Sequence, residues 1–354
     1  MRILFTSGRG WLPQTSGGVQ ASTTQLAGQL VERGNQVAIL CRLMLGGRTA
    51  FTSKLVRKLG RTRFSRDTGT GFPVYRGWDP SDTTEVVERF RPDVAAVQSG
   101  NTMEIARSLA DNNVPVVFYY RHVEFRDIGG DPTSIAGARH IANSRFTAEA
   151  YKEKFGLDAT VIPPLVERSK YLTLPRRENV TMINPYPEKG IETALAIAGE
   201  CPDIPFSLQE SWRIEAELDQ WLAGKLADLP NVSLSRRTDD MKSVYRKAKI
   251  VLAPSRWSEA WGRVATEAQF SGIPVLGSKQ GGLPEAVGPG GVTIDVNDPL
   301  ETWVSALRHM WDDQDYYAQL QDAALAHAKR SQINPDHQIA TLINILKEAI
   351  DAQV

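Results

Sequence analysis

Two glutamates separated by seven residues are the first feature of this sequence that could do chemistry. Glu259 and Glu267 lie among apolar neighbours in SEAWGRVATEAQFSGIPVL, Ser258 to Leu276. An α-helix completes a turn every 3.6 residues, so eight steps leave the carboxylates roughly 80° apart around the axis and about 12 Å apart along it. One continuous helix therefore does not aim both at a single atom. The pair is instead suited to the two ends of one elongated ligand.

Two loops elsewhere in the chain have the composition of anion sites. In PYPEKG, Pro185 to Gly190, Lys189 is expected at a helix N-terminus beside free N–H groups, a setting that suits a diphosphate. In TSGGV, Gly17 and Gly18 lead into the first long helix, where backbone N–H groups suit an anion or a close ligand. A solvated lysine and a simple turn are the respective alternatives.

Two further segments flank the glutamate pair. Gly262 and Arg263 are expected to start a helix between the two carboxylates, which offers another anion site. GGLPE, Gly281 to Glu285, is a glycine-rich turn after a strand. We therefore expect the chemistry of this chain to lie in loops at the ends of strands.

The elements that must position these loops follow an alternating pattern. Short apolar runs alternate with helical segments, which indicates parallel sheets covered on both faces. Ligands of such sheets bind at the carboxyl ends of the strands. The expected strands are Arg2–Ser7, Gln36–Cys41, Val94–Gln98, Val114–Tyr120, His140–Ser144, Ala159–Pro164, Asn179–Asn184, PFSLQE (205–210), NVSLS (231–235), Lys249–Pro254, Pro274–Ser278 and Gly291–Asp295.

The length of 354 residues exceeds what one hydrophobic core usually spans, so two domains are expected. The pattern restarts after a hinge near 163–178, which predicts an α/β domain over 1–165 and a second over 166–336. A C-terminal helix over 337–354 is free to cross back to the first domain. Its apolar residues at helical spacing are Ile339, Leu342, Ile343, Leu346 and Ile350.

Composition narrows the class of protein. Lys plus Arg and Asp plus Glu are 41 each, so the overall charge favours neither nucleic acid nor a membrane. Hydrophobic content of 42% is that of an ordinary globular protein. Cys41 and Cys201 are expected as buried thiols in a reducing cytoplasm. The N-terminus has no signal-peptide pattern, and no apolar run approaches the ~20 residues of a membrane span. We expect a soluble cytoplasmic protein.

The segment PSRWSEAWGRVATEAQFSGIPVLGSKQGGLPEAV, Pro254 to Val287, resembles the nucleotide-sugar-binding region of the GT4 family of retaining glycosyltransferases. About thirty residues match the family pattern in residue type and spacing, through the E-x7-E pair and the GRV, PV and GG-PE elements. The likeness extends over nearly the whole chain, through Gly17–Gly18, Lys189–Gly190, IANSRFTAEAY and VIPP. It implies the GT-B fold, with two Rossmann-like domains facing each other across a cleft, the first on the acceptor side and the second binding the nucleotide sugar.

The resemblance also implies roles for residues. Glu267 would hold the ribose hydroxyls, because a carboxylate accepts two hydrogen bonds from a vicinal diol. Glu259 would contact the transferred sugar, with backbone groups of Ala260, Trp261, Gly262 and Arg263 positioning it. Lys189 and Gly18, beside Gly17, would neutralise the departing diphosphate. His122 matches a position that approaches the donor sugar. Family members need no side-chain base, no cofactor and no divalent metal.

One departure from the family pattern concerns a cation. Members often carry Gly-Arg before the helix that follows Lys-Gly, and Ile183-Asn184 stands at that place here. Asn184 donates hydrogen bonds but has no charge. Either Arg9, Arg121 or Arg263 substitutes, or the donor binds more weakly. The segment QESW, Gln209–Trp212, also departs from the usual glycine-rich turn.

The function that the resemblance implies is transfer of a hexose from a nucleotide sugar to a saccharide or lipid-linked acceptor, as in bacterial polysaccharide or glycoconjugate synthesis. A non-catalytic or weakly hydrolytic sugar-nucleotide-binding protein of the same fold is the alternative. A dinucleotide-binding dehydrogenase does not fit, because the first strand is not followed by G-x-G-x-x-G closing onto a helix. The sequence leaves open the base (UDP, GDP or ADP), the sugar, the acceptor and the oligomeric state.

A basic amphipathic segment stands apart from these motifs. No acidic residue occurs between Glu32 and Asp67, and residues 50–66 combine Phe51, Leu55 and Leu59 on one helical stripe with neighbouring lysines and arginines. Such a helix suits an anionic membrane surface, for example the inner face of the plasma membrane. A solvated flap over the acceptor cleft is the alternative.

Overall fold

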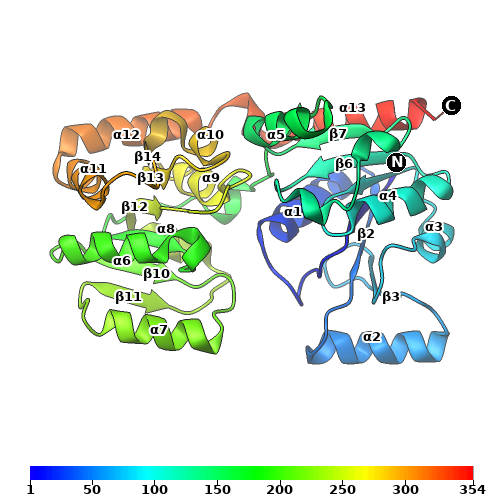
Figure 1. The fold of residues 1–354 in the computed structure, drawn as a ribbon, viewed down its shortest axis with the longest axis horizontal. Helices are drawn as coiled ribbons and strands as arrows, with labels where there is room; N and C mark the ends of the chain where they lie inside the picture. Colours follow the sequence, from blue (N-terminus) through cyan, green and yellow to red (C-terminus); the bar gives the residue numbers. More distant parts are fainter. Residues whose placement is uncertain (354) are drawn as a thin grey trace. The chain divides into compact units, whose positions relative to one another are not determined.

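A computed structural model describes residues 1–353 as two compact units, each an α/β sandwich (Figure 1). Unit 1 comprises Met1–Leu165 and the segment that starts at Asn334, and unit 2 comprises Val166–Ile333. The second boundary lies three residues before the expected one at 336/337, because Asn334 caps the helix that belongs to unit 1.

Unit 1 is built on a sheet of order β3-β4-β2-β1-β5-β6-β7-β8, parallel except where β3 pairs with β4. The strands are β1 (Arg2–Ser7), β2 (Gln36–Arg42), β3 (Ser65–Asp67), β4 (Val74–Gly77), β5 (Val94–Val97), β6 (Val116–Tyr120), β7 (Arg139–Ala142) and β8 (Thr160–Val161). The helices are α1 (Gly18–Glu32), α2 (Gly47–Gly60), α3 (Thr84–Phe90), α4 (Thr102–Asp111), α5 (Arg145–Phe155) and α13 (Pro335–Asp351).

Alternate residues of the unit 1 strands feed two cores, one on each face. Ile3 and Phe5 pack with residues of α1 and α13, whereas Leu4 packs with residues of α3 and α4. Burial on both faces explains why these strands are continuous apolar runs rather than alternating ones. The carboxyl ends of β1 and β6 are thereby fixed, and loops that carry Gly17, Gly18 and His122 follow them.

The last helix of the chain belongs to unit 1 (Figure 1). α13 packs beside α1 and β5 to β7, far from it in sequence. Gln338 on this helix is buried and donates to the Pro163 carbonyl at 2.9 Å. Of the expected apolar stripe, Ile339, Leu342 and Leu346 are buried in the core, whereas Ile343 and Ile350 are only partly buried against it. Ile345 and Ala349 complete the buried face.

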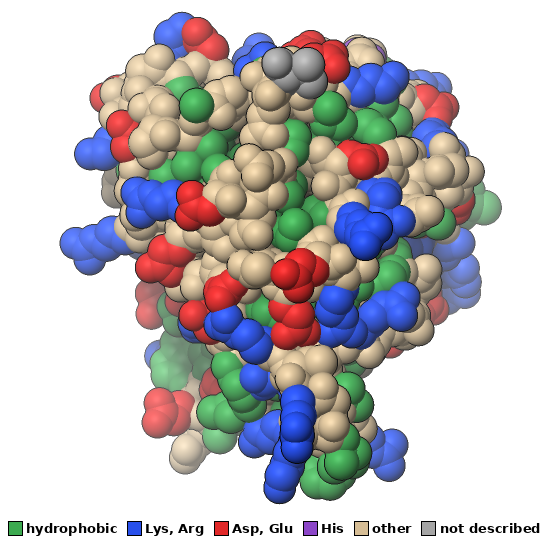
Figure 2. Space-filling model, turned by 90° about the vertical axis from the view of Figure 1, so that its right-hand side faces the viewer, with side chains coloured by type: hydrophobic (Ala, Val, Ile, Leu, Met, Phe, Trp, Pro, Cys, Tyr) green, Lys and Arg blue, Asp and Glu red, His purple; other side chains and the backbone are tan. Residues whose placement is uncertain are grey.

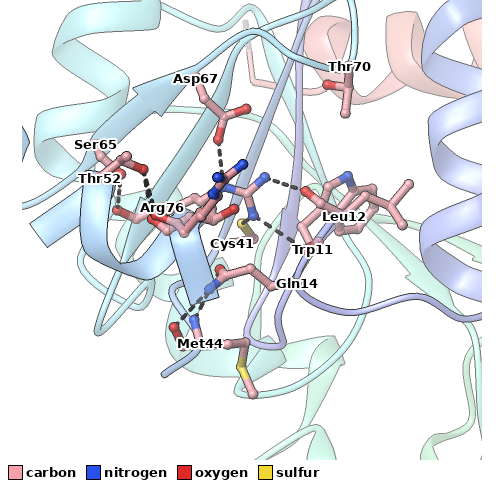
Figure 3. A network of polar contacts seen from close by, with 12 residues as sticks. Trp11, Leu12, Gln14, Cys41, Met44, Thr52, Ser65, Asp67, Thr70 and Arg76 are labelled. Atoms are coloured by element: carbon pink, nitrogen blue, oxygen red, sulfur yellow. Dashed lines mark hydrogen bonds and ion pairs between the residues drawn. The ribbon is translucent and has the colours of Figure 1, made fainter. Parts of the chain in front are cut away.

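A fully buried arginine fixes the loop between β1 and α1 (Figure 3). Arg76 on β4 is 0% exposed and its Nε lies 2.6 Å from Asp67 of β3. Its guanidinium also donates to the carbonyl of Trp11, at 3.4 Å, and to that of Leu12. These bonds hold the loop that leads to Gly17. The β3–β4 hairpin is missing from the sequence prediction because an arginine in a short run indicates a solvated position.

Unit 2 is built on a parallel sheet of order β11-β10-β9-β12-β13-β14. The strands are β9 (Asn179–Ile183), β10 (Phe206–Gln209), β11 (Val232–Ser235), β12 (Ala248–Ala253), β13 (Val275–Ser278) and β14 (Gly291–Ile294). The helices are α6 (Ile191–Glu200), α7 (Ala216–Leu226), α8 (Met241–Lys247), α9 (Arg263–Gln269), α10 (Leu283–Val287), α11 (Leu300–Asp312) and α12 (Gln314–His327). One core lies under α6, α11 and α12, and the other under α8, α9 and α10.

The parallel α/β architecture with two sheets confirms the expected fold class. Cys41 and Cys201 are free and buried, as expected. No helix among residues 1–353 combines the length and the apolar composition that crossing a membrane requires.

Candidate functional site

Glu259 lies in the loop between β12 and α9, where it meets Lys189. The Nζ of Lys189 is 2.5 Å from Glu259 Oε1, and the hydroxyl of Ser255 donates to the same oxygen at 2.9 Å. The Lys189 and Glu259 side chains are 20% and 17% exposed, so the pair is accessible from one side. Two predicted site residues 70 positions apart are thus brought into direct contact.

Close backbone packing holds this pair in place. Gly190 has φ +80°, and a Cβ there would lie 1.9 Å from the carbonyl oxygen of Pro254. Gly281 has φ +60°, and a Cβ there would lie 2.2 Å from the carbonyl oxygen of Glu259. Because neither position has room for a side chain, the Lys189 loop and the GGLPE turn lie against the glutamate loop on both sides.

Glu267 lies one turn inside α9 and is only 7% exposed. Its Oε1 is 3.1 Å from Nη2 of Arg263, one turn earlier, and its Oε2 accepts from the Tyr245 hydroxyl at 2.7 Å. Burial and then the Glu267 charge raise the pKa of Tyr245, so this hydroxyl remains a proton donor. Arg263 also donates to the Tyr171 hydroxyl at 3.1 Å. Both oxygens of Glu267 therefore have fixed partners.

The residues between the two glutamates form the start of α9. Gly262 is the N-cap with φ +92° and supplies no capping side chain. Trp261 is buried, and its Nε1 donates to Thr266 at 3.0 Å, while Ala260 is also buried. The indole thus fixes the turn that separates Glu259 from Glu267. As expected, a helix starts at Gly262 and Arg263, so Glu259 lies before it and Glu267 within it.

Asn184, at the position where related sequences often have arginine, organises a neighbouring loop. It has φ +59°, and its Oδ1 accepts from the backbone N–H groups of Ser211 and Trp212 at 3.1 and 2.7 Å. The Trp212 ring centroid is 5.2 Å from Nζ of Lys189. Asn184 therefore shapes the QESW segment, and Trp212 adds a cation–π contact to the predicted lysine.

The unit 1 candidates lie at the ends of β1 and β6. Gly17 is the N-cap of α1 and Gly18 its first residue, with no side-chain cap, as an anion site at this helix requires. His122 follows β6 and is 16% exposed; its Nδ1 is 3.1 Å from Glu124 and its Nε2 is 3.9 Å from Asp127. The imidazole is thus flanked by two carboxylates.

Each arginine considered as a substitute cation already has protein partners. Arg9 pairs with Asp127, near His122 in unit 1. Arg121 is 6% exposed and donates to Gln98 at 3.0 Å and to Thr23 at 3.2 Å. Arg263 lies in unit 2 with Lys189, but it is bound to Glu267.

The sequence does not indicate Ser255 or Tyr245 as residues of the unit 2 site, and it indicates Trp212 only as part of the departing segment QESW. Ser255 is within the matching PS element of the family pattern, which could have drawn attention to it. Trp212 and Tyr245 come from a loop and a helix outside the pattern, and no spacing links them to the glutamates. Within residues 1–353, no group of three or more His, Cys, Asp or Glu side chains is arranged to hold a metal ion.

Two α/β units with mainly parallel sheets, one of them with a paired-glutamate site at its strand ends, have the architecture of the GT-B fold. The model of glycosyltransferase family 4 matches residues 16–170, and that of the glycosyl transferases group 1 matches residues 187–327, so together they cover most of the chain. The chain belongs to glycosyltransferase family 4.

Curated glycosyltransferases are similar in sequence to part of this chain. The D-inositol 3-phosphate glycosyltransferase of Corynebacterium kroppenstedtii is 42% identical over 97 residues, which are 27% of this chain and 21% of the relative. The Corynebacterium glutamicum protein of the same name is 37% identical over 123 residues, or 33% of this chain and 29% of the relative. The matches thus span less than a third of the length of these relatives.

Solved structures share the fold over the full length. A glycosyltransferase from Rickettsia africae has a TM-score of 0.77 at 15% identity, with 98% of both chains covered. Anabaena HepE in complex with UDP and glucose has a TM-score of 0.74 at 18% identity, covering 98% of this chain and 99% of that one.

Proposed function

We propose that this chain is a retaining glycosyltransferase that moves a hexose from a nucleotide sugar to a saccharide or lipid-linked acceptor. The observation that carries the proposal is the contact of Lys189 with Glu259, one turn before a helix on which Glu267 is held by Arg263 and Tyr245. A cation and two separately fixed carboxylates match a ligand that has a sugar at one end, a ribose at the other and a diphosphate between them.

In this proposal Lys189 and Glu259 exchange partners when the donor binds. Lys189 turns from the carboxylate to the diphosphate, and Glu259 accepts from hydroxyls of the transferred sugar. Glu267 accepts from the ribose hydroxyls, with Arg263 and Tyr245 keeping its carboxylate in one orientation. Gly17 and Gly18 present backbone N–H groups to the diphosphate, and His122 approaches the donor sugar. The leaving phosphate takes the acceptor's proton.

The donor and the metal requirement are tested together. In a thermal-shift panel of UDP-, GDP- and ADP-sugars, one donor at about 100 times its Kd should stabilise the protein by about 2.7 kcal/mol. UDP-glucose is included because HepE binds it. Transfer should continue in EDTA, and NMR should show retained anomeric configuration. No shift with any donor, or an inverted product, would overturn the proposal.

The acceptor is a saccharide or a lipid-linked sugar, consistent with bacterial polysaccharide or glycoconjugate synthesis in the cytoplasm. D-Inositol 3-phosphate belongs in the acceptor panel because it appears in the names of the relatives. Product formation with simple sugars alone would narrow the acceptor to saccharides.

A second candidate is a non-catalytic or weakly hydrolytic sugar-nucleotide-binding protein. Asn184 favours it, because its side chain holds the backbone of Ser211 and Trp212 instead of supplying a second cation. Transfer assays separate the two: sugar moved from the stabilising donor to an acceptor supports a transferase, whereas donor binding with no more than slow hydrolysis in the presence of every acceptor supports the second candidate.

A further inference from the structure

Helix α2 carries an apolar surface that nothing in the described chain covers. Its side chains Phe51, Leu55, Val56 and Leu59 are 70%, 49%, 50% and 76% exposed, and Leu45 just before it is 79% exposed. In Figure 1 this helix lies at the lower end of unit 1, apart from the helices that cover the sheet. Figure 2 shows hydrophobic and basic side chains together on the lowest, projecting part of that face.

The exposed stripe points away from the domain to which α2 is attached. Ala50 and Ser53 are the buried residues of this helix. At 100° per residue, Phe51, Leu55 and Leu59 centre roughly opposite that buried face. Turned outward and set one turn apart, they form a line along a helix about 21 Å long. This is an apolar face without an intramolecular partner.

Positive charge surrounds the stripe. From Arg33 to Arg66 the chain contains no Asp or Glu, and the exposed cations Arg48, Lys54 and Lys58 lie on α2 itself. Long basic side chains beside an apolar stripe extend their charged ends towards lipid phosphates while their stems remain on apolar surface. A neutral apolar partner would not exploit this charge.

The helix is held in this orientation before any partner binds. It packs beside β3. Nζ of Lys54 and the guanidinium of Arg57 lie 5.4 and 5.6 Å from the ring centroid of Trp78, on the inner side. Gln14 bonds the backbone of Met44, ahead of the helix, at 2.8 and 3.3 Å (Figure 3). A preformed amphipathic helix loses little ordering entropy on docking.

We propose that α2 docks unit 1 on an anionic bilayer surface. The helix lies in the plane of the interface. Phe51, Leu55 and Leu59 insert at the boundary between the headgroups and the acyl chains, and Arg48 and Lys58 contact the lipid phosphates. Lipid rather than nucleic acid is the partner, because the most exposed side chains along the helix are apolar and a polyphosphate would leave them in water. This surface is separate from the residues proposed for glycosyl transfer.

The test is co-sedimentation of the full chain with vesicles of phosphatidylcholine containing about one third phosphatidylglycerol. Wild-type protein should bind these vesicles at low salt, bind pure phosphatidylcholine weakly, and lose most binding at about 0.5 M salt. Phe51→Ser/Leu59→Ser and Arg48→Glu/Lys58→Glu should each lower partitioning at least about tenfold. Lys154→Glu/Lys347→Glu, which changes exposed lysines of α5 and α13 in the same unit, should bind within about twofold of wild type.

Circular dichroism and melting temperature verify that the variants remain folded. Absence of vesicle binding by wild type, or an equal loss in the Lys154/Lys347 control, overturns the proposal. So does a dimer in light scattering that Phe51→Ser/Leu59→Ser dissociates, since α2 would then bind a second copy. Donor stabilisation in the thermal-shift panel is read separately, so failure of docking and failure of the proposed function are distinguishable.

Discussion

The two glutamates of the unit 2 site hold different partners, and this predicts different kinetic roles. Glu259 shares one oxygen between Lys189 and Ser255, a set of partners that donor binding can rearrange. Glu267 is buried between Arg263 and Tyr245 and is already oriented. We expect Glu267→Gln to weaken the affinity for the bare nucleotide, and Glu259→Gln to lower kcat at least about tenfold with that affinity nearly unchanged.

Calorimetric titration with the nucleoside diphosphate and steady-state kinetics with the full donor measure the two effects. Glu200→Gln, an exposed carboxylate at the end of α6, is the control and should leave both quantities unchanged. An equal loss of nucleotide affinity in the Glu259 and Glu267 variants would contradict this division of roles.

Arg76 is the residue whose replacement should cost most stability. Its buried guanidinium binds Asp67 and two loop carbonyls. Arg76→Leu should destabilise unit 1 by about 3 kcal/mol, because Asp67 loses its partner and the carbonyls lose their donors. That corresponds to a melting temperature roughly 6–12 °C lower.

Lys152→Leu provides the comparison, since Lys152 pairs with Asp158 at the surface and both side chains are mostly exposed. It should cost about 0.5 kcal/mol or less. Scanning calorimetry measures both variants. Similar losses of stability in the two variants would mean that the buried Arg76 network stabilises the protein no more than a surface ion pair does.

At the residue scale, motif spacing in the sequence indicates some residues of the candidate site. It does not indicate those that come close to the glutamates only when the chain folds. Glu259, Lys189 and Glu267 stand at family-like positions, and the structure brings the first two into contact. Tyr245 lies on α8, and its bond to Glu267 depends on how α8 packs beside α9. The sequence indicates that Asn184 replaces an arginine of the family pattern. In the structure its backbone at positive φ and its amide oxygen shape the next loop.

At the scale of elements, the loop between β9 and α6 must remain free of side-chain bulk. Gly190→Ala would place a methyl group 1.9 Å from the Pro254 carbonyl oxygen at a residue with positive φ. The loop must then move, and Lys189 with it, so kcat/KM should fall more than about tenfold, a loss of over 1.4 kcal/mol.

Gly199→Ala on α6 is the matched substitution. The new methyl group would have its nearest neighbour, Leu229, at 3.7 Å, and alanine favours a helix by about 0.5–1 kcal/mol. This variant should keep full activity and melt no lower than wild type. Donor kinetics and melting curves of the pair test the prediction, and full activity in Gly190→Ala would refute it.

The strands of both sheets were predictable because burial on two faces makes each a compact apolar run. β1 has the expected bounds, and β12, β13 and β14 are within one residue of theirs at each end. The observed strand ends differ from the expected ones where a proline or a polar residue interrupts the apolar run. For example, β6 begins at Val116, after a proline, rather than at Val114. The β3–β4 hairpin could not be predicted, since Arg76 becomes buried only through partners from three other segments. These partners are Asp67 of β3, the Trp11 and Leu12 carbonyls of the loop after β1, and the Cys41 thiol of β2.

At the scale of the whole molecule, one half-buried histidine should make stability depend on pH. Burial, and then the charge of Arg139, lower the pKa of His140 from 6.5 to about 4. In the unfolded chain the His140 imidazole is therefore protonated below about pH 6.5, whereas in the folded chain it is protonated only below about pH 4. Stability from this group is complete above pH 6.5 and falls by up to about 3 kcal/mol as the pH drops to 4.

His140→Phe should flatten the melting temperature across this range, because phenylalanine keeps the stacking with Phe118 and Tyr120 but does not titrate. Melting curves at half-unit intervals of pH compare the two slopes. Parallel slopes in wild type and variant would show that other groups control the acid response.

The connectivity of the two units has a consequence for synthesis on the ribosome. Unit 1 takes its core residues from the first 165 positions and from α13, so the whole of unit 2 is translated between its two parts. Unit 2 is contiguous and is able to fold while the chain is still growing. The sheet of unit 1 is made first and keeps part of one apolar face uncovered until α13 emerges, so we expect chaperones to bind the nascent N-terminal half.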